Sequence, residues 1–440
     1  MIARLALILA LALATGVVAG VAAGPAAAQS VYGCDNLAGR NALPAVEGAD
    51  GVFYRIDPDM YNFHAFAPET VALMARLSDA LAAQGTTLVY VPVPTKSMAM
   101  PGRLPPLARD LGHDPDLAAT GYDDALRQMS LAGVTAVNLR RALRTGADGP
   151  LPFFQADYRM TPDGARLAAQ AIAAVVAATP GFDAIPKTQF DTVETGSTVL
   201  PSPMRSVLQR HCMIALPPVA TDVFQTNRFQ ALTTTGGGLF EQGNARTRIV
   251  LLGTEDTGGP TANLAGFLAQ ETGLDVVEYA VPGGGAFAAI STYLTSASFA
   301  QGRPAYLVWA NPVHESLART GDQPMRELIA AAAGRCSVVL PLAAGTQPNA
   351  IAADLRGLPP GSADMVFVDA DGAQATRARF DFAGPDGLVR SRHVLRHADQ
   401  APTGRFYMPM DGLWSQGAQT VTIALDVPPG PNARVMVCAQ

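Results

Sequence analysis

A glutamate follows the apolar run at 249–252, at a point in the chain where side chains can do chemistry. The run predicts a buried strand, which a Gly-Thr pair brings to a turn ahead of a helical pattern at 262–270. In open α/β folds, binding and catalytic groups gather at the carboxyl ends of such strands. We therefore expect Glu255 to face a site, with Thr254 and Asp256 beside it.

A second charged pair, Asp157 and Arg159, lies just ahead of a predicted helix. Thr161 is a favourable N-cap residue, and Pro162 suits the first helical position. A guanidinium stays protonated at neutral pH, so Arg159 cannot serve as a general base.

Two more polar residues follow predicted strands. Lys96 ends the strand expected at 86–97, and His314 follows the one expected at 305–310. Both would lie at the carboxyl edge of a sheet, so both are candidates for the same site. The alternatives are a solvated loop charge for Lys96 and a surface position for His314.

Small residues nearby offer another chemistry. Thr254, Thr257 and Ser291 carry hydroxyls, and the backbone N–H groups around Gly284 could bind an oxyanion. Such residues also serve turns and helix starts, which is the alternative reading.

The acidic residues Asp157, Glu255 and Asp256 could form a carboxylate pair for glycan cleavage or a Ca²⁺ site. Arg159 among them argues against both. The sequence therefore predicts no metal and no cofactor.

Strands alternate with helices between residue 70 and residue 333, which indicates an α/β sandwich around a mostly parallel sheet. The expected helices are at 70–83, 122–129, 262–270 and 325–333, with one more starting at Pro162 and another running from the PGGGAF turn through Thr292. The expected strands are at 86–97, 134–139, 151–154, 249–252, 275–280 and 305–310. Residues 180–245 have little periodicity and are expected to form an irregular insertion.

From Cys336 onward, short alternating runs separated by Gly/Pro turns predict an all-β module of sandwich type at 336–440. Within it, the segment 377–405 holds six arginines and two histidines against three aspartates. That segment is either a solvated charged loop or a surface for an anionic, hydroxyl-rich polymer. The candidate carbohydrate-binding residues are Arg390, Arg392, Arg396, Arg405 and Trp414.

The first 28 residues read as a secretory signal, with Arg4, an apolar run and an Ala-Ala-Ala cleavage site. A retained membrane anchor is the alternative. No later segment is long and apolar enough to span a bilayer, so we expect a soluble, periplasmic mature chain. The net charge of −6 argues against nucleic acid as a partner.

An even number of cysteines in an exported chain favours disulfides over free thiols. Of three connectivities, Cys34 with Cys212 and Cys336 with Cys438 is favoured because it places one bridge in each half of the chain.

These segments, in this order, resemble the periplasmic alginate O-acetyltransferase family of AlgX and AlgJ type. The resemblance rests on LVYVPVPTKS, DYRMTPDGARLAA, VLLGTEDT, NLAGFLAQETGLDVVEYAVPGGGAF, AYLVWANP and the placement of the cysteines. It implies a circularly permuted SGNH-hydrolase-like α/β/α domain at 29–335, a C-terminal carbohydrate-binding module, and acetyl transfer to hydroxyls of an exported polyuronate.

The family's catalytic residues are an aspartate and a histidine before the Thr-Pro helix and a serine after Gly-Thr. The resemblance places them at Asp157, Arg159 and Glu255, so the aspartate alone is retained. Because a cation and an anion replace the histidine and the serine, we expect an Arg159–Glu255 ion pair with Asp157 on the other side of the guanidinium.

Two functions follow from these residues. The first is a periplasmic exopolysaccharide protein that binds an anionic glycan such as alginate, or organises other export and acetylation proteins, with a degenerate acetyltransferase site. The second is an active polysaccharide O-acetyltransferase with a non-standard site. The loss of the standard nucleophile and base favours the first.

Overall fold

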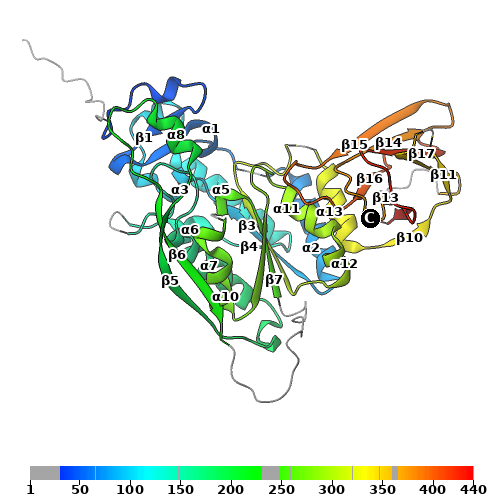
Figure 1. Cartoon of the computed structure of the whole chain (residues 1–440), viewed down its shortest axis with the longest axis horizontal. Helices are drawn as coiled ribbons and strands as arrows, with labels where there is room; N and C mark the ends of the chain where they lie inside the picture. The colour runs from blue at the N-terminus through cyan, green and yellow to red at the C-terminus, as the bar shows by residue number, and fades with distance from the viewer. Residues whose placement is uncertain are drawn as a thin grey trace, which may run out of the picture.

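The structure, a computed structural model, describes residues 30–439 except 65, 147–148, 230–247, 258, 320, 346 and 359–364. An α/β part and a β-sandwich lie side by side (Figure 1). The predicted leader at 1–28 and a stretch of the predicted insertion fall outside the described residues. In the described part, every helix is too short or too polar to cross a bilayer.

A five-stranded parallel sheet forms the centre of the α/β part. Its order is β4 (Thr135–Ala136), β3 (Thr87–Val93), β9 (Tyr306–Pro312), β7 (Arg248–Gly253) and β8 (Asp275–Ala280). The inner strands are rich in Val, Ile and Leu because both of their faces are covered. Since all pairs are parallel, the carboxyl ends meet at one edge.

Helices cover both faces of this sheet. One face carries α6 (Leu139–Leu143), α7 (Pro162–Ala177) and α10 (Leu264–Thr272), and the other carries α2 (Pro68–Ala82), α11 (Ala288–Thr295) and α13 (Gln323–Ala333). Successive strand residues point to opposite faces, so Leu251 joins the first core and Leu252 the second. The shorter or peripheral helices are α1 (Ile56–Asp59), α3 (Lys96–Ala99), α4 (Leu107–Asp110), α5 (Pro115–Leu131), α9 (Gly259–Ala262) and α12 (Ala297–Gln301).

The predicted start of α7 is confirmed. The Thr161 side chain accepts a hydrogen bond from the N–H of Gly164, and Pro162 is the first helical residue. Two short strand predictions were less accurate. The strand expected at 134–139 is the two-residue β4 followed by α6, and the one expected at 151–154 is a single bridge between Phe153 and Met160.

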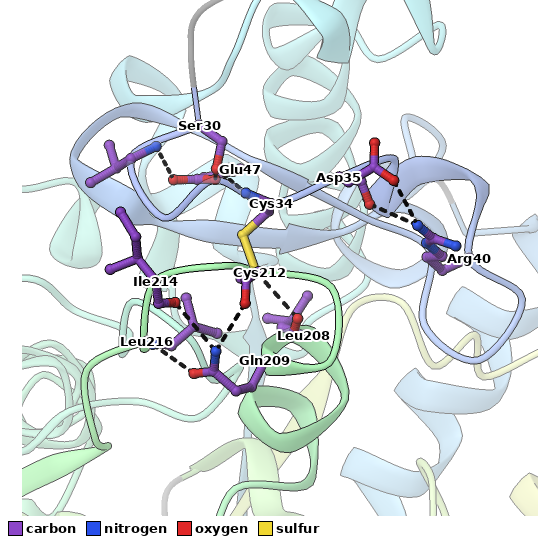
Figure 2. The surroundings of a disulfide bond; sticks show 11 residues. Ser30, Cys34, Asp35, Arg40, Glu47, Leu208, Gln209, Cys212, Ile214 and Leu216 are labelled. Atoms are coloured by element: carbon purple, nitrogen blue, oxygen red, sulfur yellow. Dashed lines mark hydrogen bonds and ion pairs between the residues drawn. A yellow bond between two sulfur atoms is a disulfide. The ribbon is translucent and has the colours of Figure 1, made fainter.

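Both predicted disulfides are present. Cys34 bonds to Cys212 and ties the N-terminal segment to the end of α8 (Pro203–Gln209), beside the small antiparallel sheet of β1 (Ala45–Glu47) and β2 (Phe53–Arg55) (Figure 2). Cys336 bonds to Cys438 across two neighbouring strands of the sandwich.

The segment expected to be irregular contains a long antiparallel ribbon, β5 (Phe190–Val199) paired with β6 (Ala220–Arg228). Most residues of β5 are exposed on both faces. Without a buried face, the strands have no apolar alternation to reveal them.

The sandwich packs a four-stranded sheet against a five-stranded one. The first sheet consists of β10 (Cys336–Val339), β18 (Arg434–Cys438), β13 (Met365–Asp369) and β16 (Arg405–Pro409). The second consists of β11 (Leu342–Ala344), β12 (Ala350–Asp354), β17 (Thr420–Leu425), β14 (Arg377–Ala383) and β15 (Val389–Leu395). Alternate residues of β14, Phe380 and Phe382, are fully buried between the sheets, as the sequence pattern predicted.

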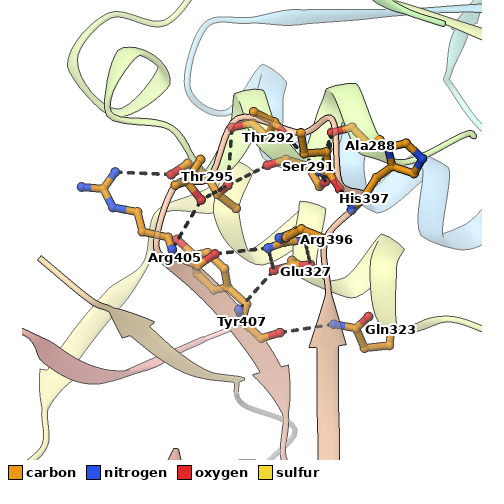
Figure 3. Close-up of polar contacts among 12 residues, drawn as sticks. Ala288, Ser291, Thr292, Thr295, Gln323, Glu327, Arg396, His397, Arg405 and Tyr407 are labelled. Atoms are coloured by element: carbon orange, nitrogen blue, oxygen red, sulfur yellow. Dashed lines mark hydrogen bonds and ion pairs between the residues drawn. The ribbon is translucent and has the colours of Figure 1, made fainter. Parts of the chain in front are cut away.

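A buried polar junction fixes the sandwich to the α/β part (Figure 3). Arg396 donates to both carboxylate oxygens of Glu327 on α13, over 2.8 and 2.6 Å, and Glu327 also accepts from the N–H of Tyr407. The side chains of Arg396 and Glu327 are 8% and 2% exposed.

Candidate functional site

A cavity of about 750 Å³ opens at the carboxyl edge of the parallel sheet. Its walls come from the ends of β3 and β9, the turns after β7 and β8, the segment around 55–66, and α5. This is the place where open α/β folds hold their ligands.

Five Tyr and Phe side chains line the cavity, and we call them its aromatic wall: Tyr61, Phe63, Phe66, Tyr90 and Tyr122. Tyr90 and Tyr122 are buried. Phe63 is 66% exposed and Tyr61 50% exposed, so their rings are available to a ligand. Aromatic faces combined with polar groups suit the alternating apolar and hydroxyl surfaces of a sugar ring.

Glu255 lines the cavity, as the sequence predicted for this turn. It begins a 3₁₀ turn at Glu255–Thr257 directly after β7. Its Oε2 accepts a hydrogen bond of 2.7 Å from the N–H of Gly283, which has a φ of +66° that favours glycine. The turn also holds Thr254, which is 5% exposed and lines the cavity, and the backbone of Asp256, whose side chain lies outside the described part.

Two backbone donors at this turn are already used: Gly283 donates to Glu255, and Gly284 donates to the carbonyl of Val281 over 3.0 Å. A side chain at Gly284 would come within 2.4 Å of the Cβ of Ala288, so this glycine allows a close approach to α11. This arrangement favours the turn-forming alternative over an oxyanion hole.

Asp157 is completely buried and binds Arg159, two residues later in the chain. The Nε and Nη2 of Arg159 each donate to one carboxylate oxygen over 2.9 Å, and Nη2 also donates to the carbonyl of Pro201. Although burial opposes it, hydrogen bonds from Arg159 and Ser202 hold the pKa of the Asp157 carboxyl below its usual value.

The predicted Arg159–Glu255 ion pair is therefore wrong. Among the ion pairs within 4.0 Å in the described residues, Arg159 has Asp157 as its partner, and Glu255 is in none. Glu255 is near enough only to add a small upward contribution to the pKa of Arg159, which is raised mainly by the hydrogen bonds to Asp157. Asp157 is the preferred partner because it lies only two residues away in the chain and can bind the guanidinium through both carboxylate oxygens.

Lys96 is buried below the Asp157 segment and does not line the cavity. Its Nζ donates to the carbonyls of Phe154, Gln155 and Asp157. Burial lowers the pKa of Lys96 to about 7. Its three hydrogen bonds hold the backbone around Asp157, so Lys96 is neither a solvated loop charge nor a group facing the ligand.

His314 lines the cavity, and its side chain is 18% exposed. Burial, with the nearby Arg55 guanidinium, lowers the pKa of His314 to about 4, so the ring is neutral at physiological pH. The surface alternative for this residue is wrong. Arg55, which the sequence did not single out, also lines the cavity and pairs with buried Asp59.

The predicted hydroxyl candidates Thr257 and Ser291 are engaged locally. The Thr257 hydroxyl donates to the carbonyl of Thr254, and the Ser291 hydroxyl donates to the carbonyl of Ala288 within α11. In the described part of the chain, no three or more His, Cys, Asp or Glu side chains gather as a metal site.

The five predicted carbohydrate-binding residues have different contacts. Arg396 and Arg405 lie at the junction with the α/β part, where Arg405 pairs with Asp369 and Arg396 with Glu327. Arg392 donates to the carbonyls of Pro409 and Asp411, and Arg390 donates to the neighbouring carbonyl of Gly412. The guanidinium carbon of Arg390 lies 4.6 Å from the ring centroid of Trp414, and Arg390 is exposed. Glycan binding by these residues remains a prediction.

Comparison with known proteins identifies the family of this chain. The model of the SGNH hydrolase-like domain of acetyltransferase AlgX matches residues 45–313. Alginate biosynthesis protein AlgX of Pseudomonas aeruginosa is 29% identical over 274 residues, which cover 62% of this chain and 56% of that protein. The probable alginate O-acetylase AlgJ of Pseudomonas syringae pv. tomato is 29% identical over 285 residues, covering 60% and 69%. The chain thus spans little more than half the length of the AlgX relatives it matches.

Solved structures agree on the fold. The structure of Pseudomonas aeruginosa AlgX superposes with a TM-score of 0.76 at 23% identity, covering 90% of this chain and 95% of that one. The O-acetyltransferase domain of Pseudomonas putida AlgJ superposes with a TM-score of 0.50 at 23% identity, covering 65% and 98%. The predicted α/β domain followed by a β-rich region is therefore confirmed at the level of fold.

Proposed function

The chain belongs to the family of the SGNH hydrolase-like domain of acetyltransferase AlgX, and from that premise we propose that it is an exported glycan-binding protein of exopolysaccharide O-acetylation. Its ligand is an anionic polysaccharide such as alginate, a class suggested by the names of its AlgX and AlgJ relatives. Its partners are other periplasmic export or acetylation proteins.

One observation carries this proposal: the cavity has an aromatic wall, while the residues at the family's catalytic positions are committed to the protein's own structure. Arg159 is chelated by Asp157 and cannot take a proton from a hydroxyl. Glu255 reaches the cavity, but its Oε2 holds the Gly283 turn. A site of this kind supports binding, because the two aligned positions do not carry the serine and histidine on which acyl transfer by a Ser-His-Asp triad depends.

A second candidate function is acetyl transfer by other residues. It is favoured by His314, a neutral imidazole that lines the cavity, together with Thr254, a hydroxyl-bearing residue that lines the same cavity. A neutral imidazole can accept a proton. On this alternative, turnover would disappear in His314→Gln.

The domain division and compartment complete the proposal. We assign 29–335 to the SGNH-like unit and 336–440 to a carbohydrate-binding module, because each disulfide closes within one of these ranges. Two disulfides and the signal-like leader at 1–28 support export to the periplasm.

Binding is tested with a fluorescently labelled oligouronate and the mature chain. Phe63→Ala should weaken binding about fivefold to tenfold, about 1 to 1.4 kcal/mol for an aromatic contact. Phe229→Ala is the matched control, since Phe229 is equally exposed at 63% and lies outside the cavity. Equal effects of both variants, or no affinity of the wild type, would contradict the proposal.

Catalysis is tested with a chromogenic acetate ester. We expect the wild type to match Asp157→Ala at background, and the double variant Glu255→Ser/Arg159→His to gain turnover. Wild-type turnover that falls in His314→Gln would establish the enzymatic alternative instead.

A further inference from the structure

One carboxylate oxygen of Glu255 is available to a ligand. Glu255 lines the cavity and is partly exposed, and its Oε2 accepts from the N–H of Gly283. Its Oε1 takes part in no hydrogen bond or ion pair with another described residue. An ionised carboxylate can only accept hydrogen bonds. Glu255 therefore presents an acceptor, and no donor, to a molecule in the cavity.

A second acceptor is the side chain of Asn311, which is 1% exposed and lines the same cavity. Its amide nitrogen donates to the hydroxyl of Tyr90 over 3.3 Å and to the carbonyl of Glu315 over 3.2 Å. Because a carbonyl can only accept, the second contact fixes which end of the amide is the nitrogen. The Oδ1 at the other end is buried and has no hydrogen-bond partner among the described residues. Burying an acceptor without a donor is unfavourable, so a ligand donor that reaches this side chain would be stabilised.

The charges on the cavity lining disfavour an anionic group inside it. Both arginines of the lining, Arg55 and Arg319, are paired with carboxylates of the protein. Two carboxylates of the lining, Asp57 and Glu255, have no cation within 4.0 Å among the described residues. A further negative charge beside them would be repelled. A uronate unit would therefore keep its carboxylate toward solvent and turn its hydroxyls toward Glu255.

We propose that Glu255 is a specificity-determining residue of the cavity: its Oε1 accepts a hydrogen bond from an unmodified hydroxyl of the bound glycan, so that O-acetylated units are rejected. An acetyl ester has no O–H to donate, and its carbonyl oxygen would face the carboxylate as one acceptor against another. A site built around a substrate hydroxyl discriminates against an analogue that lacks it. This inference rests on the proposed function and names the chemical state of the polymer that the cavity binds.

The isosteric variant Glu255→Gln tests this hydrogen-bond chemistry. Its amide oxygen can keep the contact with the Gly283 N–H, while its NH2 group replaces Oε1 and presents a donor of the same size. Affinities are measured by fluorescence anisotropy in the full mature chain for two probes, the labelled oligouronate and the same oligomer chemically O-acetylated at its ring hydroxyls. The readout is the ratio of the two affinities. Because both probes carry the same carboxylates, general repulsion cancels in this ratio.

Asp57→Asn is the control for charge, because it removes one negative charge from the same lining. It should raise both affinities alike and keep their ratio. Thermal unfolding of each variant shows that the chain remains folded.

We expect the wild type to bind the unmodified oligomer at least about tenfold more tightly than the acetylated one, and Glu255→Gln to reduce this ratio below about threefold. A wild-type ratio near one would overturn the inference while leaving the proposed function intact. So would a ratio unchanged in folded Glu255→Gln, since the size of the acetyl group would then explain the discrimination, or an equal loss of the ratio in Asp57→Asn. A wild-type chain without affinity for either probe would refute the proposed function, and this inference with it.

Discussion

Removing the positive charge from the junction between the two parts should be far more damaging than removing a similar surface charge. Arg396 and Glu327 are 8% and 2% exposed and are joined by two short hydrogen bonds. In Arg396→Met, the Glu327 carboxylate stays buried and loses its cation. Breaking one side of such a pair costs about 3–5 kcal/mol. We therefore expect the free energy of unfolding to fall by that amount.

The double variant Arg396→Met/Glu327→Gln provides the internal check. A neutral amide no longer needs a cation, and its oxygen can still accept from the N–H of Tyr407. Replacing both charges is therefore expected to cost less than Arg396→Met alone. Arg356→Met is the matched control, because Arg356 makes a similar two-oxygen contact with Asp354 on the surface and should leave stability nearly unchanged.

The assay is urea unfolding followed by tryptophan fluorescence. The chain has two tryptophans, Trp309 in the core of the α/β part and Trp414 in the sandwich, so Trp309→Phe and Trp414→Phe backgrounds report on the two parts separately. The reasoning is refuted if Arg396→Met costs under about 1 kcal/mol, or if the double variant costs the sum of the two single changes.

Three further predictions concern the residues below the site. Because the pKa of Asp157 is lowered in the folded chain, its carboxylate stabilises the fold fully above about pH 4, and this stabilisation is lost as the pH falls through the lowered pKa. In Asp157→Asn, the urea midpoint should therefore fall less steeply as the pH is lowered. Lys96→Met leaves three buried carbonyls without a donor and should lower the free energy of unfolding by about 3 kcal/mol or more in urea titrations. The same change at the other lysine, Lys187, should cost clearly less, because Lys187 donates to one carbonyl. Because Arg159 and Glu255 have separate partners, the stability changes of Arg159→His and Glu255→Ser should add within about 0.5 kcal/mol in a double-mutant cycle. A larger coupling free energy between the two changes would show that the two side chains interact directly.

The parallel sheet could be predicted because the signals for its strands and helices lie within short, continuous stretches of sequence. β7 and β9 are apolar runs covered on both faces. The Thr-Pro pair that predicts the start of α7 forms the N-cap and the first helical residue in the structure. The disulfides followed from the export signal and an even cysteine count. The β5–β6 ribbon had no such signal, since its residues are mostly exposed and rich in Thr.

The site was less predictable because it depends on contacts between distant segments. Glu255 was found from its place after β7, and Asp157 was correctly expected beside Arg159. The expected Glu255 contact of Arg159 was wrong, because Asp157 binds both Nε and Nη2 of the guanidinium. The aromatic side chains near Phe63 carry no motif. Only the fold brings them to the carboxyl edge of the sheet.

Arg159 and Glu255 stand where the resemblance expects a histidine and a serine, and their separate partners show that neither side chain needs the other. A mutual ion pair would have made them one compensated event, whereas each now has its own partner, Asp157 in one case and the Gly283 N–H in the other. The glutamate therefore has a definite structural effect: it holds the N–H of Gly283. A serine at the same position would release that N–H, which could then serve as a donor to a developing oxyanion. The same backbone group would support catalysis in a chain with that serine, whereas in this chain it is held by the Glu255 carboxylate.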